Sequence, residues 1–200
     1  MGSSTADVLA GIRAVANAVG EILPPEIEGK LATDVESSDG TMYPGIAAVN
    51  QKTGVAIREW PWYPEFVIVM LVPHDTVLTE AIRFDGKEEL APDYQALLAA
   101  FDAAVAARSI SDFAMTSTRG ADLNAKYLVN PYAKMLTNRL DELGALGLNV
   151  GHTGTVCGLL YPNTQPGQER ASEVCFEVSQ WFTQLKDVKV VTTPQCPQKA

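Results

Sequence analysis

The stretch Phe66-Val67-Ile68-Val69-Met70-Leu71-Val72 is the longest unbroken apolar run in the chain, and it decides the fold. The run is far too short to span a bilayer. A short, continuous apolar run of this kind predicts a strand that is buried on both faces. The segment before it, Glu59-Trp60-Pro61-Trp62-Tyr63-Pro64, cannot continue a central strand, because proline donates no hydrogen bond. We therefore predict a domain boundary there, with domains over residues 1–60 and 61–200.

Helical and strand patterns alternate downstream of this run. The expected elements are helices around residues 97–107, 111–128 and 131–143, strands at 148–150 and 157–161, a helical stripe at 174–185 and a strand at 187–192. We expect the second helix to be broken or strained near Gly120. Such alternation favours a layered fold of the α/β or α+β class, and we adopt α+β.

Upstream of the run, apolar residues recur at helical spacing, at Val8, Ile12, Val15 and Val19. The remaining elements expected there are a short helix at 26–33, a loop at 34–45 and a hairpin at 45–60. A helical stripe needs a partner layer, and one hairpin gives only marginal cover. We therefore expect residues 1–60 to keep an exposed apolar face and to be loosely folded.

Composition narrows the function classes. The chain has 200 residues, 46% of them hydrophobic and 20% charged, which is typical of a globular protein. Its net charge of −9 argues against nucleic acid or an anionic membrane as the main partner. No signal peptide is recognisable, and the three cysteines are too widely spaced for a metal motif or a disulfide framework. These features favour a reduced, cytoplasmic protein. No motif specifies an oligomeric state.

Three segments have compositions that suit ligand binding. Gly2-Ser3-Ser4-Thr5-Ala6 runs into the first helix, whose N-terminal N–H groups suit a phosphate, although this is also an ordinary N-cap sequence or a cloning remnant. Asp39, in Glu36-Ser37-Ser38-Asp39-Gly40-Thr41, is a candidate proton acceptor or an Asx turn. Gly151-His152-Thr153-Gly154-Thr155-Val156-Cys157-Gly158 joins two expected strands and suits either close backbone contact with a ligand or a plain turn.

Taken together and in this order, the three segments resemble the motifs of the GHMP small-molecule kinases, most closely the L-threonine kinases of cobalamin metabolism. Met1 to Asp7 is similar to the second half of the superfamily's phosphate loop. Residues 36–45 resemble the Glu-x-Ser-Asp-Gly-x-Met-x-x-Gly pattern of the threonine-kinase branch, and residues 149–155 resemble the third motif, which is usually richer in glycine. The resemblance extends over nearly the whole chain.

The resemblance implies roles for individual residues. Gly2, Ser3, Ser4 and Thr5 would bind the ATP phosphates, Ser4 would also contact Mg²⁺, and Asp39 would activate the substrate hydroxyl. Glu28 stands near the position of a metal-binding glutamate by spacing only. Glu26, Asp34 and Glu36 are its competitors, and a solvated helix charge is the alternative. Gly151, His152, Thr153, Gly154 and Thr155 would line the active-site cleft, although a turn residue is the preferred interpretation of His152. Arg119 is a weaker candidate for a substrate carboxylate, because a guanidinium binds carboxylates in bidentate fashion; the alternative is a surface arginine.

The resemblance also implies the architecture and the reaction. Residues 1–60 would be the remainder of a GHMP N-terminal lobe, and residues 61–200 a ferredoxin-like C-terminal domain. The expected function is ATP- and Mg²⁺-dependent phosphorylation of a small hydroxy amino acid, L-threonine first. The alternatives are a GHMP kinase for another alcohol, such as a sugar or homoserine, and a non-catalytic fragment or subunit that needs a partner lobe. The chain would begin inside the phosphate loop, so that most of this lobe would lie outside it.

Overall fold

The computed structural model describes residues 3–60, 62–74, 91–128, 130–151 and 155–195. The chain divides into two compact units, Met1–Tyr63 and Pro64–Ala200. The division falls within the proline-containing segment that precedes the apolar run. Among the helices described, none combines the length and apolar character needed to cross a membrane.

The N-terminal unit consists of two helices and a hairpin, as expected. They are α1 (Ser3–Ala18), α2 (Pro25–Thr33), β1 (Ile46–Val49) and β2 (Ala56–Trp60). Helix α1 stops just before Gly20, whose φ of +79° is a left-handed conformation that glycine adopts without strain. Strands β1 and β2 pair antiparallel, with Ile46 opposite Trp60.

A small core joins these elements. It is formed by buried Leu9 of α1, Ala32 of α2, and Met42 and Tyr43 of the loop between α2 and β1. The Tyr43 hydroxyl also donates to the Gly54 carbonyl at 2.9 Å and accepts from the Ala56 N–H at 3.1 Å. The loop is therefore held against both the helices and the hairpin.

The C-terminal unit is a ferredoxin-like α+β domain, which confirms the predicted fold class. The elements are β3 (Phe66–Val72), α3 (Ala91–Ala107), α4 (Ile110–Asn124), α5 (Pro131–Thr137), α6 (Leu140–Leu143), β4 (Gly147–Val150), β5 (Cys157–Pro162), α7 (Gln165–Trp181) and β6 (Asp187–Thr192). The strand order is β4-β5-β3-β6, and every neighbouring pair is antiparallel. The apolar run is thus an inner strand, paired on both edges.

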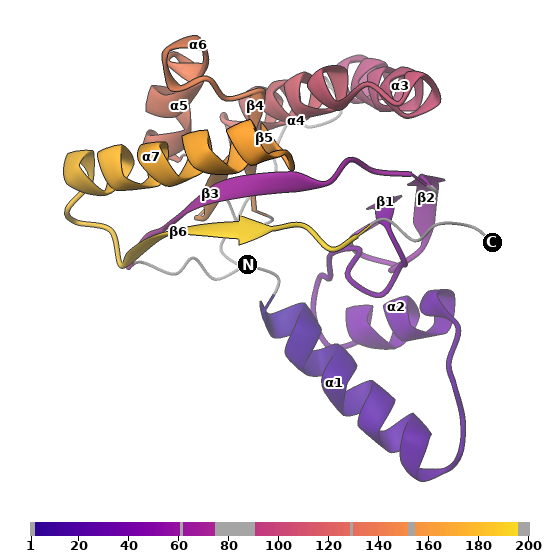
Figure 1. Cartoon of the computed structure of the whole chain (residues 1–200). Coiled ribbons are helices and arrows are strands. Elements are labelled where there is room, and N and C mark those ends of the chain that lie inside the picture. The colour runs from indigo at the N-terminus through magenta and orange to yellow at the C-terminus, as the bar shows by residue number, and fades with distance from the viewer. Residues whose placement is uncertain (1–2, 61, 75–90, 129, 152–154, 196–200) are drawn as a thin grey trace. The chain divides into compact units, whose positions relative to one another are not determined.

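Helices cover one face of this sheet (Figure 1). Helix α7 packs on β3, β5 and β6, whereas α4 packs on β4. Val174 and Val178 of α7 and Val69 and Leu71 of β3 have no exposed surface and lie in one core cluster. The helical stripe predicted around residues 174–185 therefore provides the face that buries the sheet.

The structure differs from the sequence-based expectations at two places in this unit. The helix expected over residues 131–143 is two short helices, because Arg139 leaves the helical conformation with φ −125° and ψ 13°. No break occurs at Gly120, where α4 is continuous. A Cβ at Gly120 would meet the Leu97 side chain at 3.3 Å, so this glycine allows α3 to pack closely on α4.

Candidate functional site

The first candidate segment forms the start of α1. The helix begins at Ser3 and has no acidic residue in its first turn, so its N-terminal partial positive charge is not offset there. Gly2 lies outside the described residues, and the side chains of Ser3 and Ser4 are not described. Thr5 is only 2% exposed, so its side chain is buried in this structure.

Asp39 lies in the loop between α2 and β1 and is partly exposed. Its Oδ1 accepts hydrogen bonds from the Thr41 N–H at 3.0 Å and from the Thr41 hydroxyl, which is the Asx turn considered as the alternative to a catalytic role. The two interpretations are compatible, because the hydrogen bonds that described residues donate to Asp39 all reach Oδ1. The turn fixes the carboxylate through Oδ1, and Oδ2 accepts no hydrogen bond from the residues that the structure describes.

Buried neighbours on both sides hold Asp39 in place. Ser38 has no exposed surface, its N–H donates to the Gln51 carbonyl at 3.2 Å and its hydroxyl donates to the Glu36 carbonyl at 3.1 Å. Met42 packs in the same core cluster as Leu9 of α1. The fold therefore brings the Asp39 loop and α1 together in one unit. An aromatic residue, Tyr43, in a loop otherwise rich in small residues was the sequence signal for this anchoring.

Glu28 occupies a different environment from the one predicted. It is 5% exposed, and its two carboxylate oxygens accept hydrogen bonds from Nε and Nη2 of Arg13 at 2.7 and 2.6 Å. This ion pair raises the pKa of Arg13 above its ordinary value. Arg13 is nine residues beyond Ser4 on α1, which corresponds to about 14 Å along the helix. The geometry therefore favours a structural ion pair between α1 and α2 over a metal ligand shared with Ser4, and Glu28 is not a solvated charge either.

Glu36 is one of the alternatives to Glu28 as a metal ligand, and one of its carboxylate oxygens has no hydrogen-bond donor among the described residues. Its Oε1 is buried, and no described residue donates a hydrogen bond to it. A buried carboxylate oxygen without a donor is costly unless a cation or water satisfies it. In the described part of the chain, no three His, Cys, Asp or Glu side chains cluster as metal ligands. A metal ion here would need oxygen ligands from a bound phosphate as well.

The third candidate segment connects β4 and β5. The Gly151 N–H donates to the Val156 carbonyl at 2.7 Å and closes the loop at the point where Val150 pairs with Cys157. The predicted contacts His152, Thr153 and Gly154 lie outside the described residues. Burial raises the pKa of Cys157 to about 12, so its thiol stays protonated at neutral pH and is not a nucleophile.

Asn130 anchors this loop, and we did not single it out from the sequence. It is 7% exposed, its Oδ1 accepts the Ala133 N–H at 2.8 Å as the N-cap of α5, and its Nδ2 donates to the Thr155 carbonyl at 3.1 Å. The pair Asn130-Pro131 was the available signal, because asparagine is favoured at the N-cap and proline at the first helical position.

A cavity of about 200 Å³ lies between Gly151 and one face of α4. Ser117, Gly120, Ala121 and Asn124 line it from the helix. Arg119 is on α4 but is exposed and is not among the lining residues. The structure therefore brings the α4 face and Gly151 together, and it leaves Arg119 as a surface residue outside this cavity.

No known protein-family model and no curated protein sequence matches the chain. Several solved structures match it over nearly its whole length. A putative homoserine kinase from Listeria monocytogenes aligns with a TM-score of 0.66 at 17% identity, over 96% of this chain and 65% of that one. The L. major mevalonate kinase in complex with R-mevalonate aligns with a TM-score of 0.70 at 13% identity over 96% and 65%. The homoserine kinase of Cytophaga hutchinsonii gives 0.69 at 14% over 97% and 65%.

The comparison identifies the fold. The matched residues come from both units, and at 13% to 17% identity the likeness to the homoserine and mevalonate kinases shows the fold alone. The chain spans about 65% of the length of these kinases.

Proposed function

We propose that the chain contributes to an ATP-dependent kinase that phosphorylates the alcohol group of a small hydroxy amino acid, with L-threonine as the first candidate. The observation that carries the proposal is the placement of Asp39. Its carboxylate is fixed by Thr41 through Oδ1, and buried Ser38 and Met42 flank it in the same unit as the start of α1. The fold likeness to homoserine and mevalonate kinases makes phosphoryl transfer the reaction to test.

In this mechanism the N-terminus of α1 binds the phosphates of ATP. Backbone N–H groups of the first turn donate to phosphate oxygens, and the helix dipole favours the negative charge. Ser3, Ser4 and Gly2 contribute as the resemblance implies, whereas the Thr5 side chain is buried.

Asp39 acts as the proton acceptor. The substrate hydroxyl oxygen forms a bond to the γ-phosphorus as the bond to the bridging oxygen of ADP breaks, and the hydroxyl proton passes to Oδ2 of Asp39. The Asx turn with Thr41 keeps the carboxylate from rotating away from the substrate. Gly151 and Thr155 keep the roles that the resemblance implies.

The residues present fit Mg²⁺ if Glu36 replaces Glu28 as the protein carboxylate. Mg²⁺ is usually held by one or two carboxylates together with substrate phosphates, and Glu36 has a buried oxygen without a donor among the described residues. Ser4 would be the second protein ligand. When bound, the ion would neutralise charge on the phosphate oxygens.

A substitution at Asp39 tests the proposal. We expect Asp39→Asn to lower kcat at least about 100-fold while ATP binding is retained, because the amide cannot accept the proton but keeps the Oδ1 acceptor of the turn. The measurement is coupled ADP release over L-threonine, homoserine, mevalonate and galactose. Asp141→Asn, at an exposed position in the first turn of α6, is the matched control and should leave kcat unchanged.

Two results would contradict the proposal. The first is an Asp39→Asn variant as fast as the parent, which would remove the catalytic role. The second is a chain that releases no ADP with any of the four alcohols. Preference for homoserine over L-threonine would keep the kinase but change its substrate.

A further inference from the structure

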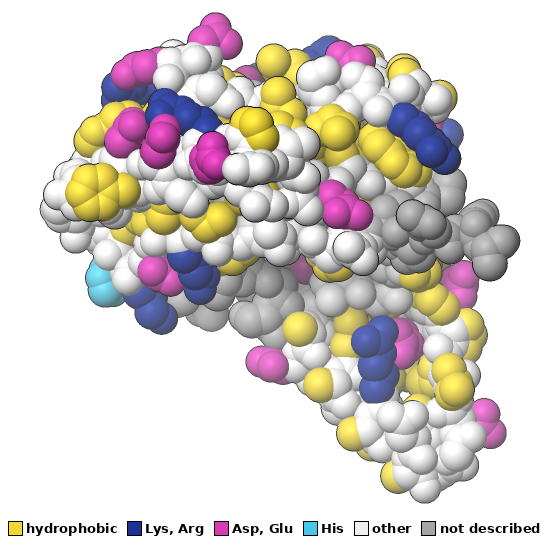
Figure 2. All heavy atoms as spheres, in the orientation of Figure 1, with side chains coloured by type: hydrophobic (Ala, Val, Ile, Leu, Met, Phe, Trp, Pro, Cys, Tyr) yellow, Lys and Arg dark blue, Asp and Glu magenta, His cyan; other side chains and the backbone are white. Residues whose placement is uncertain are grey.

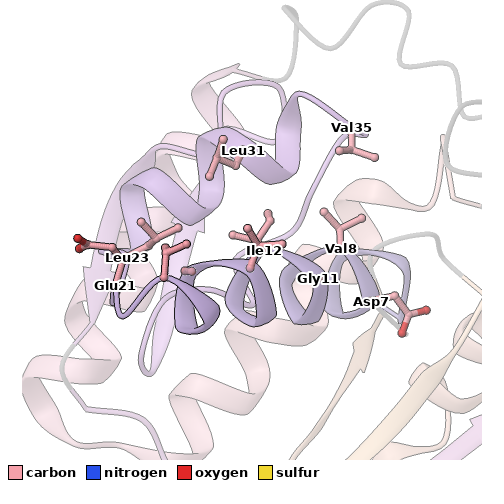
Figure 3. A pocket seen from close by; sticks show the side chains of 11 residues that line it. Asp7, Val8, Gly11, Ile12, Glu21, Leu23, Leu31 and Val35 are labelled. Atoms are coloured by element: carbon pink, nitrogen blue, oxygen red, sulfur yellow. The ribbon is translucent and has the colours of Figure 1, made fainter.

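Helices α1 and α2 leave an apolar groove between them. The groove has a volume of about 630 Å³. On the α1 side its apolar lining includes Val8, Ile12 and Val15, and Val19 just beyond the end of the helix. On the other side it includes Leu31 of α2 and Val35, two residues beyond the end of α2. Figure 3 shows Ile12 facing Leu31 and Val8 facing Val35 across the groove. The groove follows α1 for about 15 Å from Val8 to Ala18, the length of about five extended residues or ten helical ones.

The walls of the groove are exposed to solvent. Val15 and Val19 are 69% and 71% exposed, and Val35 is 68% exposed. Hydrophobic side chains lie at intervals along the surface of α1 in Figure 2. Leu9, which is not a lining residue, is 2% exposed and packs in the core of the unit instead. Contiguous exposed apolar surface of this kind marks an interaction site.

The charged residues that line the groove have one sign. Its lining residues include two carboxylates, Asp7 and Glu21, and no Lys or Arg side chain. Figure 3 shows the two carboxylates at opposite ends. An occupant with an apolar middle and a positive charge near each end would complement this pattern.

The length of the matching structures is the argument for a polypeptide occupant. The chain is matched over 96% to 97% of its length, yet it spans only 65% of the homoserine and mevalonate kinases that match it. About a third of those molecules therefore has no counterpart in these 200 residues. In the N-terminal unit, the sheet has only the two strands of one hairpin, which is marginal as an independent layer.

We propose that the α1–α2 groove is the docking surface for a polypeptide segment with an apolar face and Lys or Arg residues toward its two ends. A second copy of the chain is a poorer occupant. A two-fold contact through this face would bring the Asp7 and Glu21 carboxylates of two copies together, and each copy carries a net charge of −9. The proposal does not depend on kinase activity.

The test uses the full chain and a library of random 16-residue peptides displayed on phage. The enriched peptides should combine apolar residues in the middle with Lys or Arg near the ends. In fluorescence anisotropy, Val15→Lys should weaken binding of an enriched peptide at least about tenfold, because it places an ammonium in the groove. Phe176→Lys on α7 is the matched control, since Phe176 is 70% exposed and outside the groove, and it should leave binding within about twofold.

Several outcomes would overturn the proposal. They are a selection that enriches no sequence, enriched peptides that are acidic, and equal binding to Val15→Lys and to the parent chain. A dimer in sedimentation that Val15→Lys dissociates would make a second copy the occupant. Circular dichroism checks that the variant folds, and Val19→Lys, beyond the end of α1, replaces it if it does not.

Discussion

The two polar atoms of the Asn130 side-chain amide make different hydrogen bonds: one accepts and the other donates. Oδ1 accepts from Ala133 to cap α5, and Nδ2 donates to the carbonyl of Thr155 in the glycine loop. At 7% exposure, little water can replace either bond. An aspartate would keep the acceptor and lose the donor, so the two functions can be separated.

We expect Asn130→Asp to loosen the loop while the domain stays folded. Hydrogen exchange at the Gly151 amide, which bonds to Val156, should accelerate at least about fivefold, and the KM for the phosphorylated alcohol should rise more than kcat falls. Asn130→Ala loses the cap as well and should lower the unfolding free energy by about 1 kcal/mol more. Unchanged exchange at Gly151 in Asn130→Asp would mean that the bond to Thr155 does not hold the loop.

Residue roles followed from the sequence where local geometry determines them. The Asx turn at Asp39 was predictable, because its partner Thr41 is two residues away. The ion pair of Glu28 was not, because Arg13 is fifteen residues away and the spacing between Glu28 and Asp39 does not specify which side of α2 Glu28 occupies. The cap at Asn130 was readable from Asn130-Pro131, but its bond to Thr155 depends on the tertiary fold.

Contacts between elements in the N-terminal unit depend on two glycines. A Cβ on Gly29 of α2 would lie 2.5 Å from the Gly54 carbonyl oxygen, which real Cβ atoms do not tolerate. Gly54 ends the hairpin turn with φ +68° and accepts the Tyr43 hydroxyl. Helix α2, the hairpin turn and the Asp39 loop therefore come together where Gly29 contacts Gly54.

Two alanine substitutions test this contact. Gly29→Ala should destabilise the chain by about 1–3 kcal/mol, because the methyl group meets backbone that cannot easily move. Gly11→Ala on α1 is the control, since nothing lies within 4 Å of its Cβ position, and it should stabilise by up to about 1 kcal/mol through helix propensity. Urea unfolding measures both. Equal effects in the two variants would show that α2 does not depend on the glycine contact.

The strands and most of the helices followed from periodicity, including the last strand at residues 187–192. The division of the helix expected at 131–143 did not, because it coincides with tertiary contacts. Arg139 stacks over the Trp181 ring at 4.0 Å and pairs with Glu142, while it leaves the helical conformation. Such contacts with α7 have no local sequence signature.

At the scale of the molecule, the two units differ in how much apolar surface they bury. The core of the C-terminal unit draws on three strands, several helices and the segment after α7, and its central side chains on β3 and α7 have no exposed surface. The core of the N-terminal unit is a small cluster around Leu9, Ala32, Met42 and Tyr43. The sequence predicted this difference in burial, because the apolar stripe of α1 lacks a full partner layer in residues 1–60. Val15 and Val19 of that stripe are exposed.

We therefore expect the two units to exchange amide hydrogens at different rates. Opening free energies depend on buried apolar contact, so Phe66–Val72 of β3, paired on both edges, should exchange at least about 100-fold more slowly than the helical amides of α1 and α2. Adding a groove-binding peptide from the selection described above should slow exchange in α1 and leave β3 unchanged, because binding stabilises only the unit that binds. Mass spectrometry of the 200-residue chain measures both effects. Equally strong protection in α1 and β3 without peptide would mean that the N-terminal unit is stable as it stands, and that its apolar groove needs no occupant to fold.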